Sequence, residues 1–217
     1  MNLDVLDKGF VRLTDVMGSD LSVVNSARIS FAKESDSFSS RDENLLRYLW
    51  EHKHTSPFRH ATLQFHIKAP LFVIRQWQKH QVGCAWNEVS GRYVEFEAEF
   101  YRPKVWRKQH KDNKQGSTGA IEDQDAATVG YITALDSALS EYQWLLTQGV
   151  CKEQARMVLP LSLYTECYWT ASLQAVIHFL SLREDKHAQL EIQEYAHAIR
   201  SLSSNHFPIS LSLLKTD

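Results

Sequence analysis

Alternating hydrophobic and polar positions predict three strands in the first half of the chain. Residues 63–67 alternate strictly, and residues 94–100 place apolar side chains between glutamates. Residues 5–16 are apolar at short intervals around Gly9, before a turn at residues 17–20. A period of two is typical of a strand with one buried face, so we expect strands in all three segments.

Helical spacing dominates the rest of the sequence. Asp20 and Asp42 each precede apolar residues three or four apart and are expected to begin helices. A third helix is expected from Pro70 to about Gln81, and a loop is expected to follow it over residues 82–91. Four more helices are predicted, and Gly149 is expected to end the first of them. They cover residues 123–148, 152–159, 161–182 and 187–202. Strands followed by helices predict an α+β fold, a single domain with an antiparallel or mixed sheet packed against long helices.

Composition narrows the possible partners and compartments. The 217 residues carry 24 Lys and Arg against 26 Asp and Glu, a net charge of −2, so no global field attracts nucleic acid or anionic lipid. Three cysteines without a CxxC pair suggest neither a disulfide framework nor a zinc site. The longest apolar run, residues 69–74, is too short to span a membrane, and no signal peptide precedes it. We therefore expect a soluble cytoplasmic protein.

Polar side chains are unusually dense between residues 75 and 93. Ser90, Gly91 and Arg92 offer a hydroxyl, accessible backbone amides and a guanidinium fork, a combination that suits a phosphate. Glu88 can accept hydrogen bonds from sugar hydroxyls. Composition alone favours a solvated helix end whose charges face water.

The same segment resembles a known family signature. Residues 87–93, Asn-Glu-Val-Ser-Gly-Arg-Tyr, match the Asn-Glu-x-Ser-x-Arg-Tyr element of the flavin-dependent thymidylate synthases, and residues 75–77, Arg-Gln-Trp, match the residues that introduce the preceding part. Further stretches are similar to that family in order and spacing; they are residues 3–31, 56–77, 155–170 and 179–196. The resemblance therefore covers nearly the whole chain.

The resemblance implies a methyltransferase. Family members convert dUMP to dTMP by reductive methylation, with methylenetetrahydrofolate as one-carbon donor, FAD as redox centre and NADPH as reductant. They need no covalent enzyme nucleophile, so the protein supplies orientation and electrostatics. The family also implies a homotetramer whose active sites are shared between subunits.

The resemblance also implies roles for individual residues. Arg183 is implied as the catalytic residue that polarises the uracil ring, and Arg156 is implied to come from a neighbouring subunit. The residues implied to bind dUMP are Gln76, Lys79, Glu88, Ser90, Gly91, Arg92, Arg156 and Arg183. Those implied to bind FAD are His54, Ser56, Lys79, His80, Gln81, Glu88, Ser172, Gln174 and His178. Without the resemblance, Arg156 is equally an ordinary surface arginine, and Arg183 equally complements a helix dipole.

The sequence departs from the family pattern at several of these positions. The usual Arg-His-Arg triplet is Lys79-His80-Gln81 here, which weakens a bidentate grip on anions, and the spacer at residues 82–86 is one residue longer. A common Asn-x-Arg pair appears as Ser172 and Gln174, and a common Asn as His178. These changes leave two alternatives open, a hydroxymethyl product and methylation of the ribonucleotide UMP.

Three other functions can be read from the sequence. His52, His54 and His60 could ligate zinc, but no carboxylate lies at a recognised ligand spacing, and we expect no metal. Cys84 could be a nucleophile, although only His80 is near it in sequence. Residues 102–114 form a basic run, with Tyr101 just before it and Trp106 within it, as in a nucleic-acid-binding module. We interpret that run as a loop flanking the active site and expect neither nucleic acid nor membrane as a partner.

Overall fold

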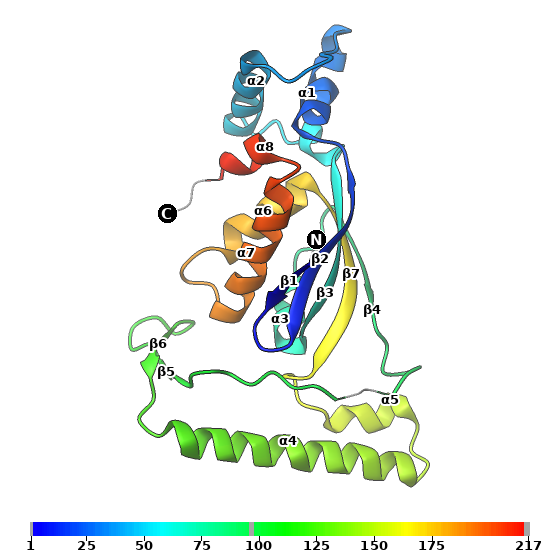
Figure 1. The fold of residues 1–217 in the computed structure, drawn as a ribbon, viewed down its shortest axis with the longest axis vertical. Helices are drawn as coiled ribbons and strands as arrows, with labels where there is room; N and C mark the ends of the chain where they lie inside the picture. Colours follow the sequence, from blue (N-terminus) through cyan, green and yellow to red (C-terminus); the bar gives the residue numbers. More distant parts are fainter. Residues whose placement is uncertain (1, 96–97, 215–217) are drawn as a thin grey trace.

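A five-stranded antiparallel sheet forms the centre of the molecule (Figure 1). The computed structural model describes residues 2–95 and 98–214. The strand order is β1-β2-β3-β7-β4; these strands span Asn2–Val5, Gly9–Met17, Thr62–Pro70, Tyr164–Ser172 and Cys84–Glu88. A separate two-stranded sheet is formed by β5 (Arg107–Gln109) and β6 (Ser117–Ala120). The α+β class with an antiparallel sheet is thereby confirmed.

Helices cover one side of this sheet, and one long helix lies across its end (Figure 1). The helices α6, α7 and α8 pack beside the sheet, and α7 contacts β1 and β2. The α-helices span Asp20–Arg28 (α1), Ser40–Glu51 (α2), Leu71–Trp77 (α3), Gln124–Thr147 (α4), Lys152–Ala155 (α5), Leu173–Arg183 (α6), Leu190–Ser204 (α7) and Pro208–Ser212 (α8). Short 3₁₀ turns are η1 (Ile29–Phe31), η2 (Ser56–Arg59) and η3 (Arg156–Val158).

The main core lies between the sheet and these helices. Alternate residues of β3, among them Leu63, Phe65 and Ile67, are fully buried, as their period of two predicts. Aromatic rings fill the space beneath α6, where Trp77 stacks on Phe179 with ring centroids 4.5 Å apart. This packing fixes the end of α3 against α6, and that contact positions the site described below.

The predicted helix over residues 161–182 is wrong in its first half. The structure has β7 there, followed directly by α6. Tyr, Thr and Trp are frequent in this stretch and favour a strand, and β7 pairs with β3 on one side and β4 on the other. Ser172 ends the strand and caps the helix, with its hydroxyl accepting from the Ala175 backbone N–H at 3.2 Å. These strand-forming residues run directly into the apolar helix α6, so the prediction joined the two elements into one helix.

Other boundaries also differ from the prediction. The stretch 5–16 is split into a hairpin of β1 and β2, and α3 ends at Trp77 rather than at about Gln81. The predicted loop at 82–91 contains β4, and residues 102–119 contain β5 and part of β6. Residues 94, 95 and 98–100 form no strand beyond a bridge from Phe100 to Leu163, and the rest of that prediction, residues 96 and 97, lies outside the described residues.

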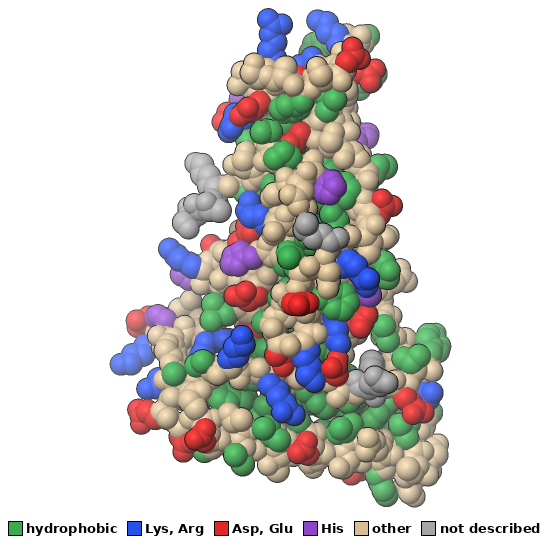
Figure 2. Space-filling model, in the orientation of Figure 1, with side chains coloured by type: hydrophobic (Ala, Val, Ile, Leu, Met, Phe, Trp, Pro, Cys, Tyr) green, Lys and Arg blue, Asp and Glu red, His purple; other side chains and the backbone are tan. Residues whose placement is uncertain are grey.

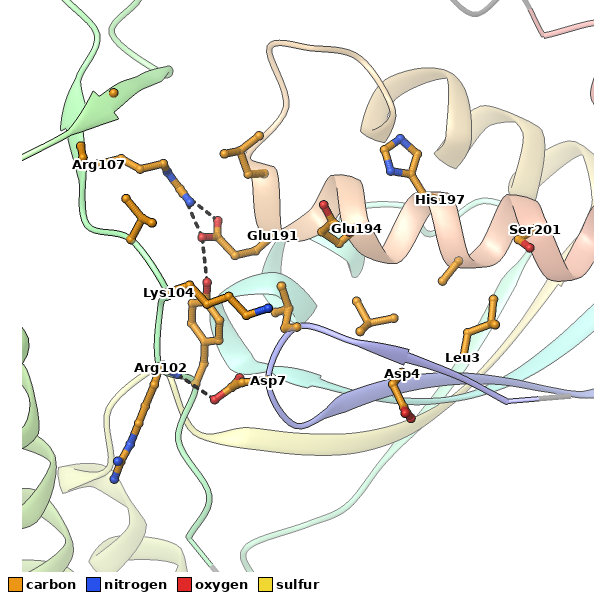
Figure 3. A pocket seen from close by; sticks show the side chains of 18 residues that line it. Leu3, Asp4, Asp7, Arg102, Lys104, Arg107, Glu191, Glu194, His197 and Ser201 are labelled. Carbon is orange, nitrogen blue, oxygen red and sulfur yellow. Dashed lines mark hydrogen bonds and ion pairs between the residues drawn. The ribbon is translucent and has the colours of Figure 1, made fainter.

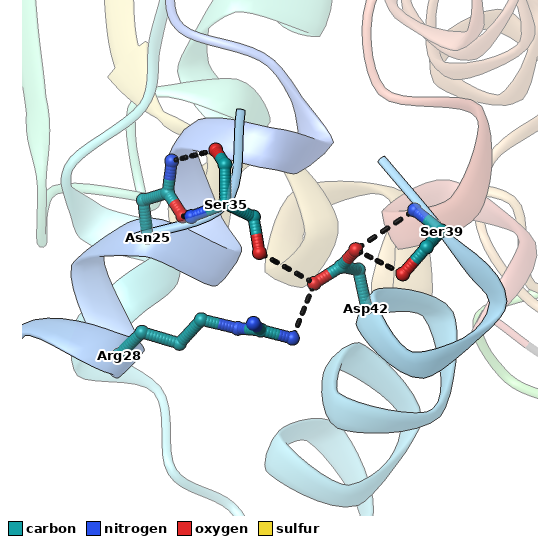
Figure 4. A network of polar contacts seen from close by, with 5 residues as sticks. All are labelled: Asn25, Arg28, Ser35, Ser39 and Asp42. Carbon is teal, nitrogen blue, oxygen red and sulfur yellow. Dashed lines mark hydrogen bonds and ion pairs between the residues drawn. The ribbon is translucent and has the colours of Figure 1, made fainter. Parts of the chain in front are cut away.

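The helices α1 and α2 are joined by a network around one buried carboxylate (Figure 4). Asp42 accepts from the Ser39 backbone N–H at 2.8 Å and from Arg28 Nη2 at 2.5 Å, and its side chain is 1% exposed. Burial opposes ionisation of this carboxyl group, but the bonds from Ser39 and the charge of Arg28 outweigh it and hold its pKa below the ordinary value. The residue that caps α2 is Ser39, whereas Asp42, which was expected to begin this helix, lies in its first turn.

Candidate functional site

Arg183, His80 and Gln76 meet where the last turn of α6 approaches the end of α3. The Arg183 guanidinium donates from Nε to His80 Nε2 at 3.0 Å and from Nη2 to the Gln76 backbone carbonyl at 3.4 Å. Three residues expected to bind nucleotide or flavin are thereby brought into contact. Arg183 also lies in the last turn of α6, where the helix dipole favours a positive charge.

Burial makes this cluster electrostatically unusual. The His80 side chain is 8% exposed, and burial, the Arg183 charge and His178 together lower its pKa to about 4. Burial also lowers the pKa of the Arg183 guanidinium, which stays charged at neutral pH. Among residues 2–95 and 98–214, no carboxylate forms an ion pair with Arg183. The cluster therefore presents a positive charge without a paired negative one.

Further contacts hold two of the predicted nucleotide-binding residues, Gln76 and Glu88. The Gln76 side chain donates to Gln189, just before α7. Glu88, at the end of β4, accepts from Thr165 Oγ1 at 2.9 Å and from Gln78 Nε2 at 3.2 Å. Both carboxylate oxygens of Glu88 are thus oriented, as a group that binds sugar hydroxyls requires.

Ser90, Gly91 and Arg92 lie in a turn after β4, close to α5. Arg92 Nε is 3.3 Å from Glu153 Oε2, and Arg156 Nε donates to the Glu153 backbone carbonyl at 3.4 Å. Both arginines are exposed, as a phosphate site requires, and Ser90 Oγ accepts from the Arg92 backbone N–H. No direct bond joins this group to Arg183 in the part of the chain that the structure describes.

The residues expected to bind flavin lie mainly along α6 and next to it. His178 is exposed and lies edge-on to His80 with ring centroids 5.5 Å apart, while Lys79 and Gln81 on either side of His80 are exposed. His54 and Ser56 are exposed in and before η2, which packs on α6 near Gln174 and the buried Ser172. Except for Glu88, every group in this set can donate a hydrogen bond to a phosphate or a ring carbonyl, so the donor set fits FAD.

A cavity of about 830 Å³ lies elsewhere (Figure 3). It opens between the β1–β2 turn, residues 101–107 and α7, and none of the residues expected to bind dUMP or FAD lines it. Arg107 and Tyr101 both bond to the buried Glu191 at its wall, with Arg107 Nη2 3.0 Å from Glu191 Oε2. The predicted site residues thus lie outside this cavity; Arg92, Arg156 and His178 are exposed, whereas His80, Gly91 and Ser172 are buried.

The contacts around the other candidate residues weaken the alternative functions. Burial raises the pKa of the Cys84 thiol, which disfavours a nucleophilic thiolate. Trp106 packs edge-on against Tyr131 and donates to Thr128, and Tyr101 donates to Glu191, so neither ring is a free stacking platform. Over the lower part of the face in Figure 2, Lys and Arg side chains are interspersed with Asp and Glu.

The described residues also bear on metal and membrane binding. Within residues 2–95 and 98–214, no three His, Cys, Asp or Glu side chains gather closely enough to hold a metal ion. The described helices include none with both the length and the apolar character needed to cross a bilayer.

Sequence reasoning missed Gln78, Thr165 and Gln189, the partners of Glu88 and Gln76. Thr165 faces Glu88 only because β7 is a strand beside β4, and that segment was predicted to be a helix. Gln189 lies within the predicted last helix but caps it in the structure. Neither pairing has a local signal, since the partners are 77 and 113 residues apart.

Comparisons with known proteins identify the family of this chain. Residues 12–209 match the family model described as thymidylate synthase complementing protein. The chain is 46% identical over 210 residues to the flavin-dependent thymidylate synthase of Thermus thermophilus, and the match covers 97% of this chain and 77% of the relative. It is 44% identical to the flavin-dependent thymidylate synthase of Kosmotoga olearia, where the match covers 97% of this chain and 91% of the relative. A crystal structure of the UMP/dUMP methylase PolB from Streptomyces cacaoi, bound with 5-Br dUMP, superposes with a TM-score of 0.87 at 32% identity, covering 97% of this chain and 96% of that one. This chain therefore belongs to the family of the flavin-dependent thymidylate synthases.

Proposed function

We propose that this protein converts dUMP to dTMP by reductive methylation, with FAD as its redox centre. The observation that carries the proposal is the Arg183 guanidinium, held by His80 and Gln76 without a paired carboxylate among the described residues. A fixed positive charge next to the uracil ring favours its ionised imide, which makes the neighbouring ring carbon nucleophilic. The Thermus thermophilus relative, named for this activity, supports the same reading.

The remaining predicted residues divide the binding of dUMP between them. Ser90, Gly91 and Arg92 bind the phosphate, and Arg156 of a neighbouring subunit completes the site. Gln76, Lys79 and Glu88 orient the sugar and base. The flavin, when bound, carries the electrons from the nicotinamide, and the donors along α6 and around His54 hold it in place.

The finer parts of the proposal concern co-substrates and assembly. NADPH supplies the electrons and methylenetetrahydrofolate the one-carbon unit, which balances the reduction of a methylene to a methyl group. The protein acts in the cytoplasm as a homotetramer. Shared active sites are supported by the exposure of Arg92, Arg156 and His178 in one chain, because a second subunit can then close over them.

A single assay tests the reaction. Purified protein loaded with FAD is supplied anaerobically with NADPH, methylenetetrahydrofolate and dUMP, and the nucleotide product is identified by mass. We expect dTMP and reoxidation of the flavin. A product heavier than dTMP by one oxygen atom would instead establish the hydroxymethyl alternative.

Methylation of UMP is a second candidate, because one structural neighbour is named a UMP/dUMP methylase and was also solved with 5-Br UMP. That structure superposes with a TM-score of 0.85 and covers 97% of this chain. Equal concentrations of dUMP and UMP in one reaction give the ratio of the two kcat/KM values directly. We expect dUMP to be preferred; a ratio near one would make the protein a methylase of both nucleotides.

A further inference from the structure

His80 contacts Arg183 in a way that only one form of its ring allows. The Nε of an arginine is always a hydrogen-bond donor, so the His80 Nε2 atom, 3.0 Å away, must accept. An imidazole accepts at Nε2 only when it is neutral and carries its proton on Nδ1. Protonated His80 would present an N–H to a donor, and the contact would be lost.

The surroundings of His80 favour this neutral ring. Arg183 and His178 on α6 are the charged or titratable groups that act on it, and from α3 the described neighbours Gln76 and Trp77 do not titrate. The ring also lies edge-on to Phe179, with centroids 5.3 Å apart, and its backbone N–H donates to the Trp77 carbonyl at 2.9 Å. Burial and these charges lower its pKa to about 4, so the ring is neutral at physiological pH.

The same contacts restrict Arg183 to one orientation. Phe179 and Arg183 are one helical turn apart on α6, so the His80 ring fits between them. With Nε held by His80 and Nη2 held by the Gln76 carbonyl, the guanidinium plane is fixed at two atoms. The opposite edge of the guanidinium, including Nη1, has no bond to the described residues and remains for a ligand.

We propose that His80 is a positioning residue that holds the Arg183 guanidinium in its working orientation through a neutral Nε2 acceptor. The proposal rests on the function proposed above for Arg183 and gives His80 a task beyond contact with flavin. Lys79 and Gln81, the changed members of the triplet, are exposed and do not share this task. Orientation matters most where charge develops during the reaction, so His80 acts on kcat more than on the KM for dUMP.

Two variants of His80 separate the effect of its hydrogen-bond acceptor from that of its ring, and a third variant serves as control. His80→Phe keeps a flat apolar ring but removes the acceptor, whereas His80→Gln keeps an acceptor at a similar reach. His66→Gln is the matched control, because His66 contacts Arg12 at 2.6 Å and lies on the sheet outside the site. We expect His80→Phe to lower kcat per bound flavin by about 10- to 100-fold with the KM for dUMP changed less than about threefold. His80→Gln should recover most of that loss.

A double-mutant cycle tests the partner. Arg183→Lys keeps the charge but has no Nε donor, so adding His80→Phe to it should cost little further activity. Equal losses in His80→Phe and His80→Gln, or additive losses in the double variant, would overturn the proposal. So would a His80→Phe enzyme that binds less flavin but turns over normally per flavin bound.

Histidine NMR spectra of the holoenzyme with ¹⁵N-labelled rings test the contact without any substrate. We expect His80 to be neutral, with its proton on Nδ1, from about pH 6 to 8. A cationic ring, or a proton on Nε2, would overturn the positioning role whatever the reaction. The expected spectrum together with failure to methylate dUMP would leave the contact intact and overturn the proposed function instead.

Discussion

At the scale of single residues, a charge without a carboxylate partner distinguishes Arg183 within the candidate site, where Arg92 is paired with Glu153. Arg28, Arg107 and Arg200, which lie outside the predicted site, are also paired with carboxylates. Arg183 is held instead by a neutral ring and a carbonyl. The sequence identified Arg183 through its resemblance to a family, but only the structure shows what holds it, because His80 is 103 residues away along the chain.

Arg92 tests the phosphate site. Arg92→Ala removes charge-assisted hydrogen bonds worth about 1.5 to 3 kcal/mol, so the KM for dUMP should rise by about 10- to 100-fold with kcat little changed. Steady-state kinetics measure this. Deoxyuridine, which lacks the phosphate, is the control substrate; an equal loss with deoxyuridine would place Arg92 outside the phosphate site.

Asp42 tests the network that joins α1 to α2. Asp42→Ala removes the buried carboxylate that accepts hydrogen bonds from Ser39, the cap of α2, and from Arg28, so the free energy of unfolding should fall by about 2 kcal/mol or more at pH 7. Because the folded pKa of Asp42 lies below its unfolded value, this stability is present above about pH 4 and is lost as the pH falls through the folded pKa.

Urea unfolding at several pH values checks both parts of the Asp42 prediction. Glu43→Gln, which breaks only the exposed pair with Arg47, should cost less than about 0.5 kcal/mol. A difference between Asp42→Ala and the unchanged protein that persists undiminished at pH 3 would contradict the electrostatic explanation.

At the scale of elements, periodicity predicted what depends on local sequence. β3, α4 and α7 were found where the spacing of their apolar residues placed them, and Gly149 follows α4 with a positive φ of 82°. β7 was missed because its two neighbours in the sheet come from distant segments. The same failure concealed Thr165, so an error in one element became an error in the site.

Gly9 and Gly130 form a matched pair for packing. A Cβ at Gly9 would lie 2.0 Å from the Tyr195 hydroxyl and 2.7 Å from the Lys68 carbonyl, so Gly9→Ala should destabilise the fold by about 1 to 3 kcal/mol. A Cβ at Gly130, inside α4, meets nothing within 4 Å among the described residues. Gly130→Ala should therefore stabilise by up to about 1 kcal/mol. Thermal unfolding compares the two, and equal midpoints would contradict the close approach of β2 to α7.

At the scale of the whole molecule, the site is open in one chain. The predicted residues fall into a group around Arg183 and a group around Arg92, and the cavity of about 830 Å³ belongs to neither. An enzyme that carries out a reduction must exclude water from its reactants, so a second subunit is the simplest cover. The proposed sharing of sites between subunits would provide such a cover.

Mixed oligomers test whether subunits share a site. Arg183→Ala and Arg156→Ala should each be nearly inactive alone. If Arg156 serves a neighbouring subunit, unfolding and refolding the two together restores about a quarter of the sites by random assembly. Refolded unchanged protein is the control for recovery. No activity in the mixture would mean that Arg156 acts in its own chain, beside Arg92.

The central claim is that this chain methylates dUMP at a flavin-bound site built around Arg183. The most direct measurement is the mass of the nucleotide formed from dUMP in the anaerobic reaction with FAD, NADPH and methylenetetrahydrofolate, run beside Arg183→Ala. We predict a product heavier than dUMP by one CH₂ group and a rate about 100-fold lower in the variant. Unchanged dUMP from a protein that has bound FAD, or an equal rate in the variant, would contradict the account.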